Sequence, residues 1–443
     1  MKRKKRGKKG GAGERWLKAL VANRRGEIFD LEDYGAVGMA GPLLEPLTLE
    51  DGVPLPHGGE LMFLPDRRPI VFNIEKGRLE TLVENPYVPG ETVFQVASFN
   101  SPGYVVTFNP AYQDEPSSPP LPLFSYGAVG WDGTGFRSSV FLVDAEKRQD
   151  LRLMPREKVV SGVERLRKKI PENRLVVHLE KCALTYGCPA AKNFFIGRFE
   201  APLPTSQVCN ARCLGCISLQ KEGVLSHCQD RISFTPTPDE IAEVALLHIK
   251  NVEKSVVSFG QGCEGDPLMA WEAILPAIRK IREASGAGTI NMNTNGSRPD
   301  IVSKLFDAGL DAIRVSLNSV RESCYQAYFR PNGYGFSDVL KTIGNGIERN
   351  RFVSINYLNC PGITDTPEER EALYSFLERY PIHMIQWRNL NFDPLRYFQV
   401  MEKADRQGRP LGMKSLIRGL KKDVPHLIHG YFNPPKEKFL RLF

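Results

Sequence analysis

The chain has 443 residues, of which 42% are hydrophobic and 25% are charged, so it is long enough for two or three domains with a substantial core. Its apolar runs are too short to span a bilayer, so we expect no membrane-spanning helix. The formal net charge is +8, but seven of these charges lie in residues 2–9 and leave the rest of the chain nearly neutral. A general electrostatic affinity for nucleic acid is therefore not expected of the folded body.

The basic tail covers residues 1–12, where a run of like charge and glycines predicts disorder. Two interpretations of the tail remain open: weak, salt-dependent binding of RNA, or a solvated segment with no dedicated partner. The apolar run Trp16–Ala22 is interrupted by Lys18, which is not typical of a signal peptide. Nine clustered cysteines indicate a reducing compartment and metal chemistry, so we expect a cytoplasmic protein.

Residues 13–150 are predicted to form a β-rich domain. A short helix is expected at Trp16–Asn23. The sequence after it is rich in glycine and proline, with short apolar runs typical of antiparallel strands. These runs are Leu61–Leu64, Ile70–Phe72, Val93–Phe94, Tyr104–Phe108 and Val140–Val143.

Residues 151–204 are predicted to be an α/β connecting segment. The charged run Arg156–Lys169 predicts a helix, and Arg174–His178 predicts a strand. Cys182 and Cys188 follow, six residues apart. They are compatible either with an auxiliary iron–sulfur cluster completed by ligands from elsewhere, or with simple packing in the core.

Strands and helices alternate regularly over residues 205–391. Thr237 and Thr366 are each followed by proline and glutamate, a pattern that predicts the start of a helix. With a strand just before Cys209, the region contains six β/α units, which favours a partial barrel or a doubly wound sheet with ligands at the carboxyl ends of the strands. The other predicted strands are Ser255–Phe259, Thr289–Asn293, Ala312–Leu317, Val353–Tyr357 and Met384–Arg388.

Three cysteines, Cys209, Cys213 and Cys216, lie within eight residues in the pattern C-x3-C-x2-C. Such short spacing lets one loop surround a single inorganic centre, and thiolates select zinc, copper(I) or iron–sulfur clusters. Closed sites use four protein ligands, so three cysteines indicate a cluster with one iron left open. With Cys228 as a fourth ligand, the same cysteines would instead form a structural zinc site.

Glycine-rich and amide-rich turns follow the predicted strands. A cluster of polar residues after the last strand is expected to lie over a substrate. In this cluster, Arg388 would pair either with an anionic group or with a structural carboxylate. Cys360, at the end of the fifth strand, is a candidate to donate a hydrogen atom or to carry an intermediate, or else a packed side chain. The turns are Gly260–Pro267, Asn293–Gly296, Ser316–Ser319 and Asn359–Asp365, and the polar cluster is Gln386, Arg388, Asn389 and Asn391.

Taken in this order, the cysteines and turns of residues 205–391 resemble the radical S-adenosylmethionine (radical SAM) superfamily. The resemblance implies that Cys209, Cys213 and Cys216 hold a [4Fe–4S] cluster whose fourth iron is chelated by S-adenosylmethionine. It also implies that an electron from the reduced cluster releases a 5′-deoxyadenosyl radical, which abstracts hydrogen from a substrate. The electron would come from an external donor of the flavodoxin or ferredoxin type.

The resemblance further implies which residues contact S-adenosylmethionine. Two positions depart from the family pattern. Asp266 stands where glutamate is usual, so Glu264 would share its role, and Gly215 replaces an aromatic residue, so stacking on adenine would come from elsewhere. The implied contact residues are Gly262, Glu264, Gly265, Asp266, Asn293, Asn295, Ser316, Asn318 and Gly362.

The fold expected with this resemblance is α/β: a partial (β/α)6 TIM-like barrel, an N-terminal β-rich domain and a C-terminal extension over residues 392–443. The substrate stays open. An RNA-modifying enzyme fits the basic tail and the basic, aromatic extension, whereas an enzyme acting on a peptide or small molecule fits the neutral body. The non-enzymatic alternative is a cysteine–metal module that binds zinc.

Overall fold

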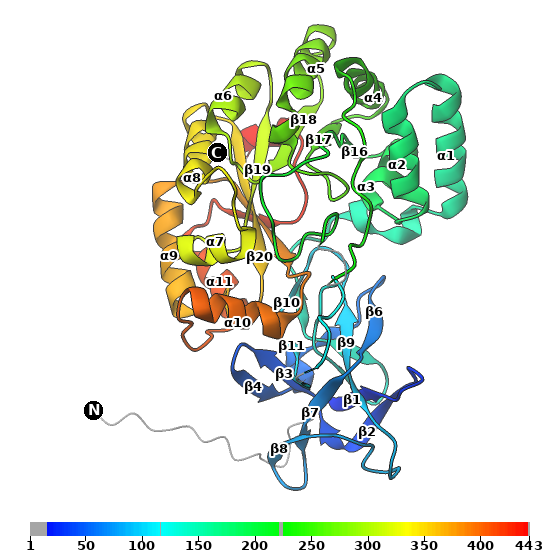
Figure 1. Cartoon of the computed structure of the whole chain (residues 1–443), viewed down its shortest axis with the longest axis vertical. Helices are drawn as coiled ribbons and strands as arrows, with labels where there is room; N and C mark the ends of the chain where they lie inside the picture. Colours follow the sequence, from blue (N-terminus) through cyan, green and yellow to red (C-terminus); the bar gives the residue numbers. More distant parts are fainter. Residues whose placement is uncertain (1–15, 116, 221–224, 442–443) are drawn as a thin grey trace.

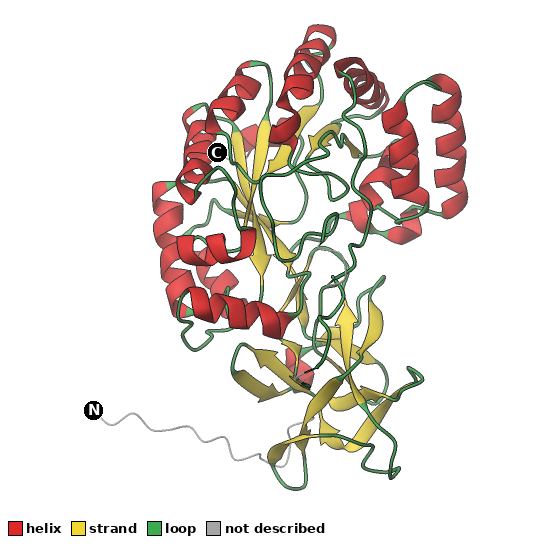
Figure 2. Ribbon diagram, viewed as in Figure 1, coloured by secondary structure: helices red, strands yellow, loops and turns green. Residues whose placement is uncertain are grey.

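The computed structural model describes residues 16–115, 117–220 and 225–441, so the predicted basic tail of residues 1–12 lies outside the described residues. A β-rich region at the N-terminus packs against a larger region in which helices surround a sheet (Figures 1 and 2). In the described part of the chain, no helix combines the length and the hydropathy that crossing a membrane requires.

The N-terminal region is built from short strands that pair with one another antiparallel, as predicted. The helix predicted at Trp16–Asn23 is wrong, because Lys18–Ala22 forms a strand between three neighbouring strands. Its last four residues are buried, so the continuous apolar run marks a central strand. The strands are β1 Lys18–Ala22, β2 Ile28–Gly35, β3 Val37–Ala40, β4 Leu43–Pro46, β5 Val53–Pro54, β6 Glu60–Leu64, β7 Arg67–Asn73, β8 Arg78–Thr81, β9 Phe94–Phe99, β10 Tyr104–Val106, β11 Asn109–Pro110, β12 Tyr112–Asp114, β13 Val129–Trp131, β14 Phe136–Ser138 and β15 Val140–Leu142.

The connecting segment is helical. The predicted helix is confirmed as α1 (Arg156–Lys169), but the predicted strand is wrong, because its residues begin α2 (Arg174–Leu184). The Asn173 side chain caps α2 by accepting from the N–H groups of Leu175 and Val176, and the apolar residues of α2 recur on one buried face. A third helix, α3 (Pro189–Phe195), leads into the sheet.

The larger region contains a seven-stranded parallel sheet in which the strands lie in sequence order. A doubly wound sheet would reverse its strand order at one point, so this sheet fits a partial TIM barrel instead. Its last strand falls in the predicted C-terminal extension, one strand beyond the six that the sequence predicts. The strands are β16 Glu200–Pro202, β17 Val256–Phe259, β18 Thr289–Thr294, β19 Ala312–Leu317, β20 Phe352–Asn359, β21 Met384–Asn389 and β22 Ile428–Gly430.

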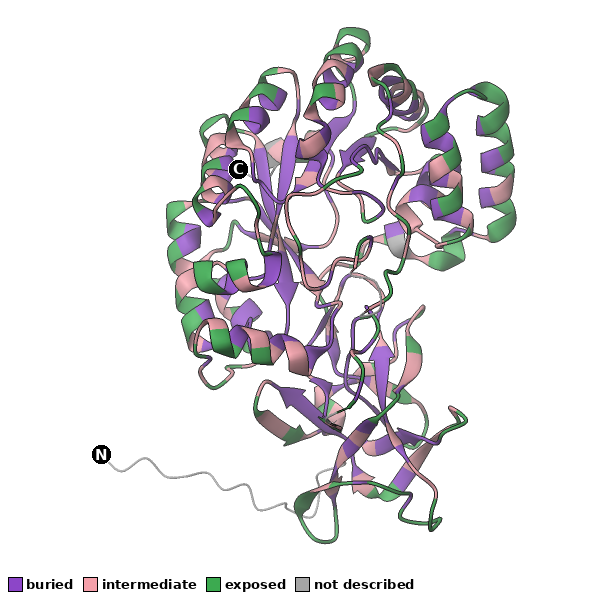
Figure 3. Cartoon of the chain, viewed as in Figure 1, coloured by how far each residue is buried: buried purple, intermediate pink, exposed green. Residues whose placement is uncertain are grey.

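Helices cover the outer face of this sheet, and the strands between them are buried (Figure 3). The predicted helix starts are confirmed: Thr237 caps α4 through a capping box with Glu240, and Thr366 caps α9. The helices are α4 Pro238–Asn251, α5 Trp271–Ala284, α6 Pro299–Asp307, α7 Glu322–Phe329, α8 Phe336–Glu348, α9 Pro367–Arg379, α10 Pro394–Ala404 and α11 Met413–Asp423.

The β-rich region docks at the carboxyl ends of β20 and β21. The Asn389 side chain accepts from the N–H of Val106 at 2.9 Å and donates to the carbonyl of Tyr104 at 2.8 Å. A buried ion pair joins Arg67 to Asp393 at 3.2 Å. The N-terminal region therefore borders the end of the barrel where the predicted site residues lie.

Candidate active site

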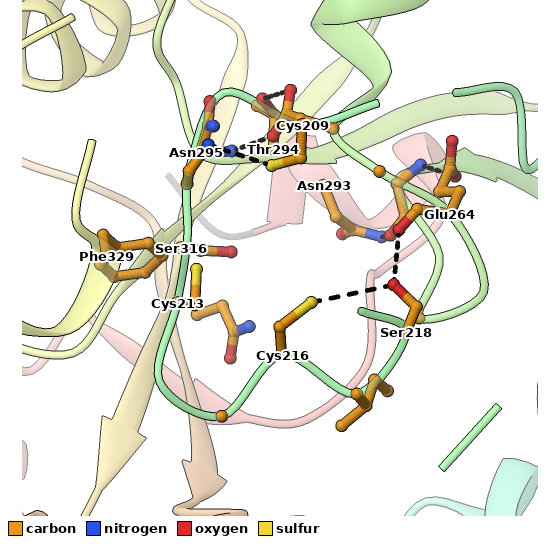
Figure 4. Close-up of a pocket in the computed structure, with 18 of the residues that line it drawn as sticks. Cys209, Cys213, Cys216, Ser218, Glu264, Asn293, Thr294, Asn295, Ser316 and Phe329 are labelled. Atoms are coloured by element: carbon orange, nitrogen blue, oxygen red, sulfur yellow. Dashed lines mark hydrogen bonds between the residues drawn. The ribbon is translucent and has the colours of Figure 1, made fainter. Parts of the chain in front are cut away.

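A cavity of about 320 Å³ lies at the carboxyl ends of the strands, and Figure 4 shows its lining. Most of the predicted site residues meet there, but Asn318 and Gly362 are not among the residues that line it. Asn318 instead donates to the Cys324 carbonyl, and Gly362 packs against Gly41. The predicted residues that line the cavity are Cys209, Cys213, Cys216, Gly262, Glu264, Gly265, Asp266, Asn293, Asn295 and Ser316.

Backbone hydrogen bonds hold the cysteine loop against the end of α7. The N–H groups of Arg212 and Leu214 donate to the carbonyls of Phe329 and Tyr328 at 2.9 and 3.1 Å. The loop is also tied to the segment after β21, where the Asn391 side chain donates to the Gly215 carbonyl at 2.9 Å. The loop is thus fixed by its main chain, which leaves the thiol groups free to face the cavity.

The three thiols lie around one space (Figure 4). Burial raises the pKa of the Cys209 thiol to about 12, so a thiolate there needs a positive partner. Two donors already face sulfur: the Ala211 N–H lies 3.4 Å from Cys209 Sγ, and the Arg231 guanidinium lies 3.7 Å from Cys216 Sγ. Three thiols with nearby donors fit an iron–sulfur cluster that has an open iron.

Cys228 does not join this group. Its thiol donates to the Leu123 carbonyl at 3.2 Å, and it is not among the residues lining the cavity. The zinc alternative that uses Cys228 as a fourth ligand therefore lacks its ligand in this arrangement.

Glu264 organises the glycine-rich loop from a buried position. Its carboxylate accepts from the N–H groups of Gly260 and Gln261 at 2.8 and 2.7 Å, and also from two residues after β16, Thr205 and Ser206. Burial raises the pKa of Glu264 to about 7, against the opposing effect of these donors. Glu264 thus joins the loop after β17 to the end of β16.

Asp266 joins the same loop to the next turn. Its carboxylate accepts from the Asn295 N–H at 2.6 Å and from the Thr294 hydroxyl at 2.8 Å, and burial raises its pKa to about 6. Glycine is required where these loops touch: a Cβ on Gly260, which has φ +78°, would lie 1.8 Å from the Asn293 carbonyl oxygen.

Arg314 projects from the middle of β19 and is a site residue that the sequence reasoning missed. It is 6% exposed, and its Nη1 donates to the Gln386 side chain at 2.8 Å. Its Nε and Nη2 atoms are buried and have no hydrogen-bond partner among the described residues. The available signal was an arginine with apolar neighbours inside a predicted buried strand.

Arg388 lines the same cavity as Arg314. In the described part of the chain, neither guanidinium forms an ion pair. The negative charge of Glu200 favours the protonated form of Arg314 without a bonded contact between them. Burial lowers the pKa of Arg314 to about 10, so it remains protonated at neutral pH. Two cationic side chains therefore face one cavity without a bonded carboxylate.

Tyr328 of α7 lies beside Gly215. A Cβ at Gly215 would be 3.0 Å from the Tyr328 hydroxyl, and both Tyr328 and Phe329 line the cavity. Aromatic side chains from α7 therefore reach the space beside the third cysteine, where the sequence itself has only glycine.

Comparison with known proteins supports this assembly. Residues 203–377 match the family model described as the radical SAM superfamily. These residues of the chain therefore form a radical SAM domain. It is 27% identical over 188 residues to the GTP 3′,8-cyclase of Thermodesulfovibrio yellowstonii (40% of this chain, 53% of the relative). It is also 27% identical over 212 residues to a probable GTP 3′,8-cyclase of Methanocaldococcus jannaschii (45% and 64%).

The chain spans between half and two thirds of the length of these curated relatives. Among solved structures, SuiB of Streptococcus suis bound to S-adenosylmethionine matches with a TM-score of 0.37 and 12% identity (53% of this chain, 50% of that one). HydG, a maturase of the [FeFe]-hydrogenase, matches with a TM-score of 0.34 and 16% identity (59% and 65%).

Proposed function

We propose that this protein is an enzyme that binds one [4Fe–4S] cluster through Cys209, Cys213 and Cys216 and cleaves S-adenosylmethionine reductively. Together these bound groups would supply a 5′-deoxyadenosyl radical for hydrogen abstraction. The observation that supports the proposal is the convergence of three thiols on one cavity, with no fourth cysteine among its described lining residues. Three protein ligands leave one iron open for the cofactor.

The same cavity offers polar groups for S-adenosylmethionine. We assign Asp266, Asn293, Asn295 and Ser316 to its methionine and ribose groups, since all four line the cavity. Glu264 mainly holds the loop in place, because each of its carboxylate oxygens already accepts from at least two donors, whereas Asp266 Oδ2 accepts from the Asn295 N–H alone among the described residues. Tyr328 is the proposed aromatic neighbour of the adenine, because it reaches the space beside Gly215, where the family usually has an aromatic residue.

The substrate is proposed to carry an oxyanion, either a carboxylate or a phosphate. Arg314 and Arg388 line the cavity as cations with no bonded carboxylate in the described part of the chain, and a guanidinium binds an oxyanion through two hydrogen bonds. The Nε and Nη2 of Arg314, which are buried and unpaired among the described residues, are such a pair of donors. Leaving buried donors unpaired costs about 1–3 kcal/mol, so a ligand that satisfies them is favoured. GTP, which appears in the names of the curated relatives, is one phosphate-bearing candidate to include in a substrate panel.

An external electron donor of the flavodoxin or ferredoxin type and a cytoplasmic location belong to the same proposal. All nine cysteines are free, as expected in a reducing compartment. RNA as a substrate has less support. In the predicted extension, Phe439 stacks on Phe352 with 4.5 Å between the ring centroids, and the Arg148 guanidinium lies over the Phe432 ring. These aromatic rings are therefore already used for packing.

The test is 5′-deoxyadenosine formation by anaerobically reconstituted protein supplied with S-adenosylmethionine and a strong reductant. We expect the wild-type chain to form the product and Cys213→Ala to form none. Cys228→Ala is the matched control and should behave as wild type, because Cys228 lies outside the cavity. Equal product from Cys213→Ala, or a colourless wild-type protein that contains zinc and no iron, would overturn the proposal and favour the zinc module.

A further inference from the structure

A second group of metal-binding side chains lies outside the cavity. His178 and Cys182 are on α2, and Cys263 is in the glycine-rich loop after β17. The Cys182 sulfur is 3.5 Å from His178 Nε2, and the three potential ligand atoms all lie within 4.8 Å of one another. Both cysteines are buried and the histidine is half-buried. None of the three is among the residues that line the cavity.

The local structure explains why these side chains meet. His178 and Cys182 are four residues apart on one helix, so they lie on the same face one turn apart. Cys263 is 81 positions further along the chain than Cys182, and its loop is held in place by the hydrogen bonds of Glu264. The group therefore exists only because α2 packs beside the loop after β17.

The spacing of the ligand atoms favours a single ion. Zinc bonds of about 2.0–2.3 Å in a tetrahedral site place neighbouring ligand atoms about 3.3–3.8 Å apart. The 3.5 Å between Cys182 Sγ and His178 Nε2 falls in this range, and all three atoms lie within 4.8 Å of one another. A four-iron cluster lies between its cysteine sulfurs and holds them farther apart. In the described part of the chain, Cys209, Cys213 and Cys216 form no such compact group, which suits cysteines that bind different irons.

Cys188 is the candidate for a fourth ligand, although its sulfur lies outside the compact group of three ligand atoms. Cys188 is half-buried, and its N–H donates to the Cys182 carbonyl at 2.9 Å, so the two backbones are adjacent and a turn of the Cys188 side chain would bring its sulfur to the ion. Three cysteines and one histidine are a common ligand set of closed, structural zinc sites.

We propose that His178, Cys182 and Cys263 bind one Zn²⁺ ion, with Cys188 as the fourth ligand. Binding would release the thiol protons and link α2 to the loop that carries Glu264 and Asp266. The ion would hold that loop rigid beside the cavity and take no part in electron transfer, because zinc has no redox chemistry in proteins. The proposal does not depend on the chemistry assigned to the cavity.

The test is a count of zinc and iron in the full chain, purified anaerobically from cells grown with both metals. We expect about one zinc per wild-type chain, and its loss in both Cys182→Ser and Cys263→Ser while iron is retained. Cys228→Ser is the control and should keep both metals. Cys213→Ala should show the reverse pattern, losing iron and keeping zinc, so the two sites fail separately.

A second measurement avoids any folding defect of the variants. Wild-type protein in which cobalt(II) replaces zinc should show the absorption bands of a tetrahedral thiolate site. Absence of zinc from the wild-type chain would overturn the proposal. So would a second complement of iron in place of zinc, or a Cys182–Cys263 disulfide found by mass spectrometry of the anaerobic protein.

Discussion

The two cysteine groups of this protein differ in how open they are. Cys209, Cys213 and Cys216 come from one loop and face a cavity, whereas Cys182 and Cys263 come from distant segments and are buried against His178. An open set of three ligands leaves room for a reacting molecule, and a closed set is suited to structural support. The glycine-rich loop connects the two groups, since it lines the cavity on one side and carries Cys263 on the other.

Exposure to air should separate the two groups most completely. We expect the iron of the open group to be lost and the zinc of the closed group to be retained, because an iron–sulfur cluster is oxidised through its exposed iron and zinc is not redox-active. Metal analysis before and after air exposure and desalting measures the iron content and the zinc content. Loss of zinc in parallel with iron would show that the two groups do not behave as separate sites.

Gly260→Ala should disturb both groups through the loop that they share. The new Cβ would lie 1.8 Å from the Asn293 carbonyl oxygen, at a φ of +78° that favours glycine. We expect destabilisation of about 2–4 kcal/mol and reduced binding of both metals, measured by thermal unfolding and metal content. Gly286→Ala is the control, because nothing lies within 4 Å of its Cβ position. Unchanged metal content in Gly260→Ala would argue against a shared loop.

Arg314→Gln should weaken anion binding in the cavity and leave both metals in place. Loss of a two-point hydrogen bond to an anion corresponds to about 10- to 100-fold weaker binding. Calorimetric titration with inorganic phosphate and with acetate tests the two anion types, and Arg349→Gln is an exposed control.

A titration with S-adenosylmethionine shows whether weaker anion binding by Arg314→Gln reflects a lost substrate contact or a lost cofactor contact. We expect the affinity of Arg314→Gln for S-adenosylmethionine to be unchanged and phosphate to bind alongside it. If S-adenosylmethionine binding falls instead, Arg314 serves the cofactor and the proposed anionic substrate loses its support.

Tyr328→Phe should have the smallest effect. The ring beside Gly215 remains and only the hydroxyl is removed, so the affinity for S-adenosylmethionine should change by less than about threefold. Tyr328→Leu removes the aromatic ring and should cost more, about 0.5–1.5 kcal/mol of binding free energy. Equal affinities of the two variants would exclude stacking by this ring.

Much of the barrel could be predicted from the sequence, because its signals are local. The strands β17–β21 were expected within one or two residues of their observed ends, since buried parallel strands have continuous apolar runs. Thr237 and Thr366 predicted two helix starts, because a capping hydroxyl bonds within its own turn. The three clustered cysteines also predicted the position of the cavity, because they lie close together in the sequence.

Local sequence patterns gave the wrong secondary structure where the packing of a segment against distant parts of the chain decided between helix and strand. The apolar run Lys18–Ala22 is compatible with either a helix or a central strand. It forms a strand because it pairs with β2, β9 and β13. Arg174–His178 is likewise helical because its apolar face packs in the core.

The sequence by itself determined the radical SAM motif, the order of the β/α units and the polar turns after them, because each depends on residues close together in the chain. Only the tertiary structure decided that Tyr328 lies beside Gly215, that Arg314 lines the cavity while two of its donors are buried and unpaired among the described residues, and that Cys263 meets His178 and Cys182. These contacts join segments that are distant in the sequence, and their positions are fixed by the packing of helices and loops around the sheet.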